Sequence, residues 1–167
     1  MFPLKKLGSD AIVRAFERAE QFRLLNQPWA AESICLDILE TQPGHQDALR
    51  VLLLARTDQF GGETPGIVEK AREVLGQLTG DYERLYYAGI IAERRAIAKL
   101  HQRAPGAGFV AYEWIREAMA WYEKAFAIRH QGDDDAVLRW NTCARLLANS
   151  PHIVPRGDDS AEPVIGE

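Results

Sequence analysis

The chain contains few cysteines and no long apolar run, and both shortages limit what kind of protein it can be. Cys35 and Cys143 lie far apart and belong to no CxxC or Cys/His motif, so neither a disulfide framework nor a zinc site is expected. No apolar run approaches the roughly 20 residues that a membrane-spanning helix needs. The opening MFPLKKLGSD lacks the hydrophobic core of a secretory signal. We therefore expect a cytoplasmic protein that does not bind membranes.

Catalytic and metal-binding motifs are also missing. The four histidines show no HExxH or related metal spacing, and no GxSxG, P-loop or GxGxxG motif occurs. The run Asp133, Asp134 and Asp135 lacks the further ligands of a calcium loop and suits the N-terminal end of a following helix. The net charge of -4 argues against general binding to nucleic-acid phosphates. We expect no metal, no cofactor, no nucleic-acid partner and no enzymatic activity.

The clearest positive signal is the spacing of apolar residues, which recur every three or four positions. No segment alternates apolar and polar residues with a period of two, so strands are not expected. Glycine and proline clusters such as GGETPG and RAPGAG separate the periodic segments. The fold class is predicted to be all-α, with helices at about 9–25, 28–42, 46–59, 64–78, 82–102, 109–129 and 134–149.

A chain of 167 residues is long enough for one domain with one continuous core. We expect a single domain over residues 1–150, in which the first six helices pair into units at about 10–45, 46–80 and 81–130. The helix at 134–149 would cover the last apolar face. From residue 151 the sequence is rich in proline, glycine and charge, which predicts a flexible tail over 151–167.

The paired units resemble the tetratricopeptide repeat family, with about three degenerate repeats. The small, aromatic, alanine, large, apolar and proline positions of the first repeat are occupied by Ala19, Phe22, Ala31, Cys35, Ile38 and Pro43. The third unit has Gly89 at the small position and Tyr122 on the partner helix, whereas the second unit departs from the pattern at Leu53. The resemblance implies an α-solenoid of antiparallel helix pairs with a C-terminal capping helix. A plain helical bundle with coincidental alanines is the alternative.

The resemblance also implies a binding site, because the first helix of each pair lines a concave groove in this family. The groove residues expected on that basis are Phe16, Arg23, Arg50, Leu54, Tyr86, Ile90, Arg94, Asn141 and Arg145. Their guanidinium groups would bind carboxylates or carbonyls of a partner, and their apolar side chains would anchor it. In the competing interpretation, the arginines are solvated or pair with Glu20 and Glu93.

The predicted function is therefore a non-enzymatic protein–protein interaction module, such as a scaffold, adaptor or assembly chaperone. It would hold a segment of another protein in the groove, as when an amphipathic segment docks on a preformed surface. Two alternatives remain at this point: a self-associating structural protein, and a regulatory subunit of an enzyme.

Overall fold

The computed structural model describes residues 2–157, and every regular element in this range is helical. The all-α prediction is confirmed. The elements are a short 3-10 helix, η1 (Ser9–Ala11), and the α-helices α1 (Ile12–Leu24), α2 (Pro28–Thr41), α3 (Gln46–Thr57), α4 (Ile67–Leu75), α5 (Asp81–His101), α6 (Ala107–Ala127) and α7 (Asp135–Asn149).

Proline and glycine residues set several helix ends. Pro28 occupies the first turn of α2, where its missing N–H would have no intrahelical partner in any case. Gly66 has a φ of 67°, in the left-handed region that favours glycine, and α4 begins directly after it. The predicted start of this helix near residue 64 is therefore too early. Gly106 has a φ of 74° and precedes α6 in the same way.

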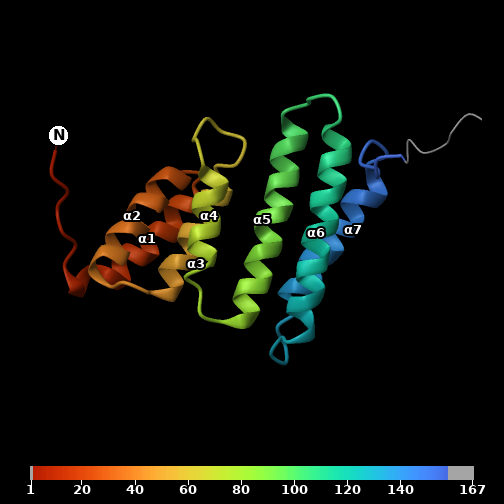
Figure 1. Ribbon diagram of the computed structural model, residues 1–167. Helices are drawn as coiled ribbons and strands as arrows, with labels where there is room; N and C mark the ends of the chain where they lie inside the picture. Colours follow the sequence, from red (N-terminus) through yellow and green to blue (C-terminus); the bar gives the residue numbers. More distant parts are fainter. Residues whose placement is uncertain (1, 158–167) are drawn as a thin grey trace, which may run out of the picture.

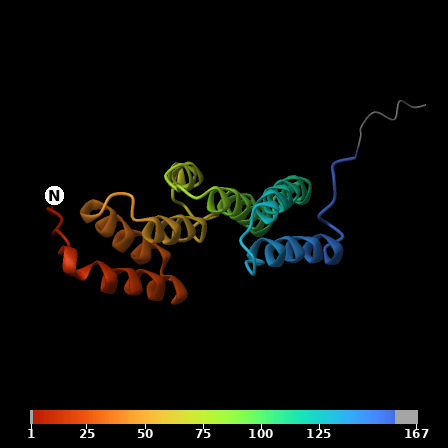
Figure 2. The ribbon, with the colours of Figure 1, turned by 90° about the horizontal axis from the view of Figure 1, so that it is seen from below.

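The helices lie side by side in the order of the chain (Figure 1). Each helix packs mainly on the helices before and after it, and the long pair α5 and α6 has the most extensive contact. α1 also touches α3, and α3 touches α5. In Figure 2, α1 and α7 lie on one side of the row and α4 on the other. One face of the row is therefore formed by α1, α3, α5 and α7.

The buried residues form two clusters that meet at α5. The first cluster contains residues of α1, α2, α3 and α4, among them Cys35, Leu53 and Val74. The second joins α5, α6 and α7 around Tyr122 and Cys143. α5 contributes buried side chains to both clusters, so this helix connects the two halves of the row.

The folded region continues past the predicted domain end at residue 150. Ile153 is only 3% exposed and packs in the second cluster. The carbonyl oxygen of His152 lies so close to Gly108 of α6 that a Cβ atom at Gly108 would overlap it. Residues 158–167 of the predicted tail lie outside the described residues. Within residues 2–157, no helix combines the length and the apolar character needed to cross a membrane.

Candidate functional site

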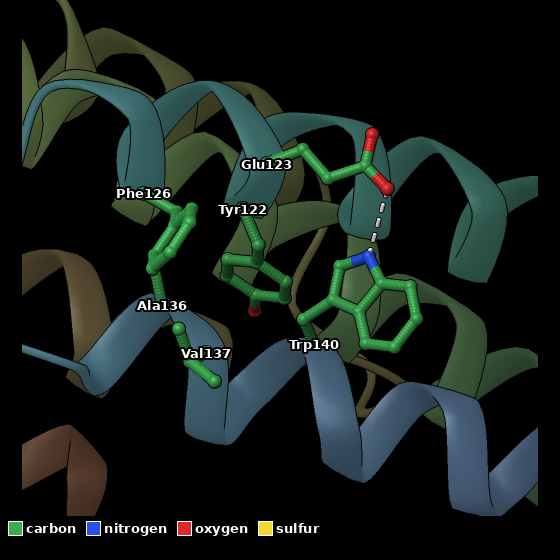
Figure 3. Close-up of a pocket in the computed structure, with 6 residues that line it drawn as sticks. All are labelled: Tyr122, Glu123, Phe126, Ala136, Val137 and Trp140. Atoms are coloured by element: carbon green, nitrogen blue, oxygen red, sulfur yellow. Dashed lines mark hydrogen bonds between the residues drawn. The ribbon is translucent and has the colours of Figure 1, made fainter.

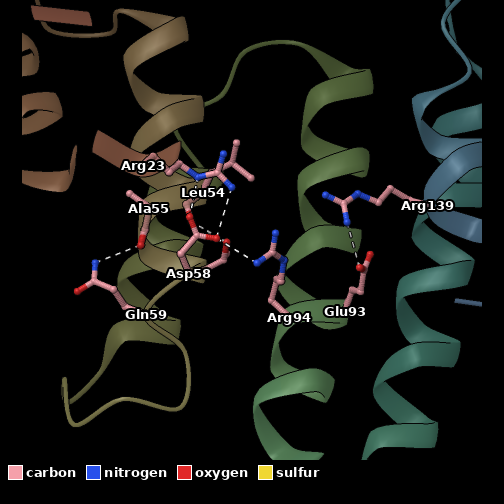
Figure 4. Close-up of polar contacts among 9 residues, drawn as sticks. Arg23, Leu54, Ala55, Asp58, Gln59, Glu93, Arg94 and Arg139 are labelled. Carbon is pink, nitrogen blue, oxygen red and sulfur yellow. Dashed lines mark hydrogen bonds and ion pairs between the residues drawn. The ribbon is translucent and has the colours of Figure 1, made fainter. Parts of the chain in front are cut away.

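The face formed by the odd-numbered helices carries a cluster of charged side chains at its centre (Figure 4). Arg23 comes from α1, Asp58 directly follows α3, and Arg94 comes from α5. The predicted groove residue Leu54 lies on α3, one turn before Asp58. The structure therefore brings three predicted residues, Arg23, Leu54 and Arg94, to one place.

Asp58 pairs with both arginines. Its Oδ2 atom lies 2.6 Å from Nε of Arg23, and its Oδ1 atom accepts a hydrogen bond from Nη1 of Arg94 at 3.0 Å. The Nε–H of Arg23 has no well-aligned acceptor, so its contact with Oδ2 is an ion pair rather than a good hydrogen bond. The Asp58 side chain is 17% exposed, which reduces solvent screening of both pairs. We call Arg23, Asp58 and Arg94 the Asp58 cluster.

Three further predicted residues, Arg50, Phe16 and Tyr86, are partly buried. Arg50 pairs with Asp47 within α3 and reaches Glu83 of α5 at 3.9 Å. Phe16 stacks on His45, with ring centroids 6.1 Å apart. Tyr86 stacks on Tyr82 at 5.9 Å, within a group of tyrosines on α5 and α6. Arg50, like Arg23 and Arg94, is therefore paired with carboxylates of the protein itself.

A second polar group links α5, α6 and α7. Glu93 is only 7% exposed; it accepts a hydrogen bond from the Tyr122 hydroxyl at 2.6 Å and another from Arg139 at 3.2 Å. Burial raises the pKa of Tyr122, and the neighbouring Glu93 carboxylate raises it further. Burial alone would lower the pKa of Arg139, but Glu93, Tyr86 and Tyr122 together outweigh burial and raise the pKa. Glu93, Tyr122 and Arg139 therefore form a structural network in which Glu93 and Tyr122 are buried and Arg139 is partly exposed.

Three predicted groove residues lie elsewhere. Ile90 is 1% exposed and belongs to the second core cluster, so the prediction that it lines a surface is wrong. It is buried because α5 packs against α6 and α7 as well as against α3. Asn141 lies on α7, one helical turn after Val137. Because Val137 lines the space between α6 and α7, Asn141 is on the same side of α7. Arg145 is exposed one turn further along.

The sequence interpretation missed Asp58 and Arg139. Asp58 follows Leu54 by four residues, so extending the predicted α3 stripe by one turn would have included it. The expected partners were Glu20 and Glu93, but Glu93 pairs with Arg139. Among residues 2–157, Glu20 forms no ion pair. Arg139 was missed because Asn141 and Arg145 were the residues of α7 expected to face the groove, whereas Arg139 is the one that reaches α5.

A cavity of about 310 Å³ lies between α6 and α7 (Figure 3). Its lining residues are Tyr122, Glu123, Phe126, Ala136, Val137 and Trp140. The indole N–H of Trp140 on α7 donates a hydrogen bond to Glu123 on α6 at 3.0 Å, so this bond joins the two helices beside the cavity. The lining is mostly apolar, so the space suits an apolar side chain.

Both cysteines are buried. Burial raises the pKa of each thiol to about 12, with smaller contributions from Glu32 at Cys35 and from Glu93 at Cys143. The thiols are therefore uncharged at neutral pH and are weak nucleophiles. Within residues 2–157, no three His, Cys, Asp or Glu side chains are grouped so that they could hold a metal ion.

Comparisons of the chain with protein-family models, with curated proteins and with solved structures give no significant match.

Proposed function

We propose that this chain is a cytoplasmic, non-enzymatic protein-interaction module built as a tetratricopeptide-like solenoid. The order of helix packing supports this proposal, because each helix contacts mainly its neighbours in sequence. The close contact of Gly89 with Tyr122 also supports it, because Gly89 is at the small position of the third expected repeat and Tyr122 is on the partner helix of that repeat. The binding surface would be the face formed by α1, α3, α5 and α7, which we call the inner face.

The Asp58 cluster is the observation that carries the proposal. Asp58 holds two guanidinium groups from different helices in fixed positions on one face. A guanidinium group has five N–H donors. Within the described residues, Arg94 uses only Nη1 for its side-chain hydrogen bond to Asp58. Its other donors remain available to a carbonyl or carboxylate oxygen of a partner, and the Arg94 side chain is 30% exposed.

Apolar side chains flank this charged centre. Leu54 and Phe16 are partly exposed. Val13 and Leu24 are strongly exposed, and their spacing from Phe16 and Arg23 places them on the adjoining side of α1. A partner segment with both polar and apolar groups would therefore find complementary groups on the inner face. Because the arginines are already oriented, binding loses less side-chain entropy.

Site-specific photo-crosslinking in the native cell tests this proposal. A benzophenone amino acid would replace Glu20, which is exposed on α1 between Phe16 and Arg23, or Ser33, which is exposed on α2. We expect crosslinks to a second protein from position 20 and none from position 33. Adding Arg23→Gln and Arg94→Gln should sharply lower the yield at position 20. Equal yields from both positions would refute binding on the inner face.

Self-association is a second candidate because large apolar side chains are exposed where α1 turns into α2. Leu24 is 84% exposed, and Trp29 is 69% exposed, with Leu25 between them also exposed. Exposed apolar patches often mark contact sites. Sedimentation velocity over a concentration series would test this candidate. A dimer that dissociates in Trp29→Glu would support it, and a monomer at every concentration would exclude it.

A further inference from the structure

A second surface lies on a different side of α5 from the Asp58 cluster. Two cavities, of about 310 and 280 Å³, adjoin at Arg95, which lines both. The first lies among α4, α5 and α6, and the second lies among the same three helices and the loop that follows α3. We call this surface the cationic groove and define it by Arg72, Leu75, Arg95, Lys99, Trp114 and Trp121.

The charge of the groove is positive although the chain is acidic overall. Arg72, Arg95 and Lys99 line it, against a single lining carboxylate, Glu117. Within the described part of the chain, none of these three cations forms an ion pair. Glu117 instead accepts the indole N–H of Trp121 at 3.5 Å. The groove therefore contrasts with the inner face, where Arg23, Arg50 and Arg94 all have carboxylate partners.

Arg95 is held in place at the centre of the groove. Its guanidinium carbon lies 4.1 Å from the centroid of the Trp114 ring, which is the geometry of a cation–π contact. Burial lowers the pKa of Arg95 and the positive charge of Arg72 lowers it further, whereas the carboxylates of Glu117 and Glu69 have smaller, opposite effects. Arg72 and Arg95 both line the first cavity, so an anion bound there would lie near two positive charges and reduce their mutual repulsion.

The rest of the lining indicates what kind of anion fits. Leu75 and Ile91 border the first cavity, and Phe60 and Val68 border the second. A ligand that fills both cavities needs apolar groups on either side of its negative charge. A peptide can supply both, whereas a nucleic acid relies on many phosphate contacts and would need more than three cations.

We infer that the cationic groove binds an acidic segment of another protein, with one carboxylate between Arg72 and Arg95 and an apolar side chain against Leu75 and Ile91. Arginine suits this role because its planar group can bind a carboxylate through two parallel hydrogen bonds. This inference does not depend on the inner face, and either surface can fail its test without affecting the other.

Fluorescence anisotropy with the full chain tests the inference. The probe is a fluorescein-labelled octapeptide of alternating Glu and Leu, and its matched control has Gln in place of every Glu. We expect the Glu peptide to bind about tenfold more tightly than the Gln peptide, as for one charge-assisted contact. Equal binding of the two peptides would overturn the inference.

Matched variants locate the binding. Arg72→Gln with Arg95→Gln should weaken binding of the Glu peptide by about tenfold or more. Lys70→Gln with Arg116→Gln removes the same charge from exposed positions of α4 and α6 outside the groove, and should change the affinity by less than about twofold. Because Arg95 also packs on Trp114, thermal unfolding by circular dichroism accompanies each variant. Lys99→Gln, which leaves that contact intact, should also weaken binding.

Three further outcomes would overturn the inference. In the first, the groove variant and the control variant bind the Glu peptide equally. In the second, Arg23→Gln with Arg94→Gln abolishes binding while the groove variant retains it, which would place the peptide on the inner face. In the third, a labelled oligothymidylate binds more tightly than the peptide and depends on Arg72 and Arg95, which would make nucleic acid the ligand.

Discussion

Gly89 of α5 lies directly against the ring of Tyr122 of α6, so closely that a Cβ atom at Gly89 would overlap the ring carbons. Tyr122 is fully buried, and its hydroxyl donates a short hydrogen bond to Glu93. The ring therefore cannot move aside without breaking that bond. Glycine inside a helix costs about 1 kcal/mol relative to alanine. Here the absence of a Cβ atom at Gly89 allows α5 and α6 to pack closely, which offsets that cost.

Replacing Gly89 with alanine should destabilise the protein even though alanine favours helix formation. The added methyl group must displace Tyr122 or separate α5 from α6, and overpacking of this kind costs about 1–3 kcal/mol. Urea unfolding followed by tryptophan fluorescence would measure the loss.

Gly76 offers a matched control for this substitution. It is exposed, its φ is -63°, and the nearest atom to an added Cβ would be the Glu73 carbonyl oxygen at 3.5 Å. Gly76→Ala should therefore leave the stability unchanged or raise it slightly. If Gly89→Ala behaves in the same way, the close contact with Tyr122 does not limit the packing of α5 and α6.

The helices themselves could be predicted well because apolar periodicity is a local property. The errors occur where a single residue determines the start of a helix or the end of the folded region. The positive φ of Gly66 delays the start of α4, and the burial of Ile153 extends the folded region beyond residue 150. Neither effect is visible in the helical pattern, since one depends on a turn conformation and the other on a contact with α6 and α7.

The inner face could be predicted only in part. Arg23 and Arg94 meet there as expected, because helical spacing fixes which side of its own helix each residue occupies. Their shared partner Asp58 was missed, because the distance between α1, α3 and α5 is a tertiary property. Ile90 was misplaced for a related reason: α5 is covered on more than one side, so its apolar residues are not free to line a surface.

Replacing Glu93 with alanine should strongly destabilise the protein. The change leaves the Tyr122 hydroxyl and the Arg139 guanidinium without their acceptor. Breaking a buried charged contact by removing one partner costs about 3 kcal/mol or more. Urea unfolding at neutral pH would measure this effect.

A double-mutant cycle separates the hydrogen bond from the burial of Glu93. Tyr122→Phe removes only the hydroxyl and should cost about 1–2 kcal/mol. When Glu93→Ala is already present, Tyr122→Phe should cost less, because the hydroxyl has no partner to lose. Strictly additive effects would show that the two groups do not interact energetically.

Stability should fall as the pH rises above 9, because both thiols have raised pKa values in the folded state. The ordinary pKa of a cysteine thiol is 9.0, whereas burial raises the pKa of Cys35 and Cys143 to about 12. Between these values the unfolded chain loses thiol protons that the folded chain keeps, so deprotonation favours unfolding. From pH 9 to pH 10 the loss should be about 1 kcal/mol per thiol.

The variant Cys35→Ala with Cys143→Ala tests the origin of this loss. It should be less stable than the parent at pH 8, where it lacks two buried side chains, but its stability should fall less between pH 9 and pH 10. Urea unfolding at each pH would measure both effects. An equal fall in the two proteins would attribute the alkaline loss to other groups, such as the tyrosines.

Ile153 should stabilise the fold although it lies beyond the last helix. Its side chain is buried in the cluster shared by α5, α6 and α7, so Ile153→Ala should cost about 2–4 kcal/mol in urea unfolding. The neighbouring Val154 is 40% exposed and provides the control, because Val154→Ala removes apolar volume without leaving a buried cavity. Its effect should stay within about 0.5 kcal/mol. Similar small effects at both positions would show that the segment after α7 contributes no packing energy. The predicted domain boundary at residue 150 would then be correct.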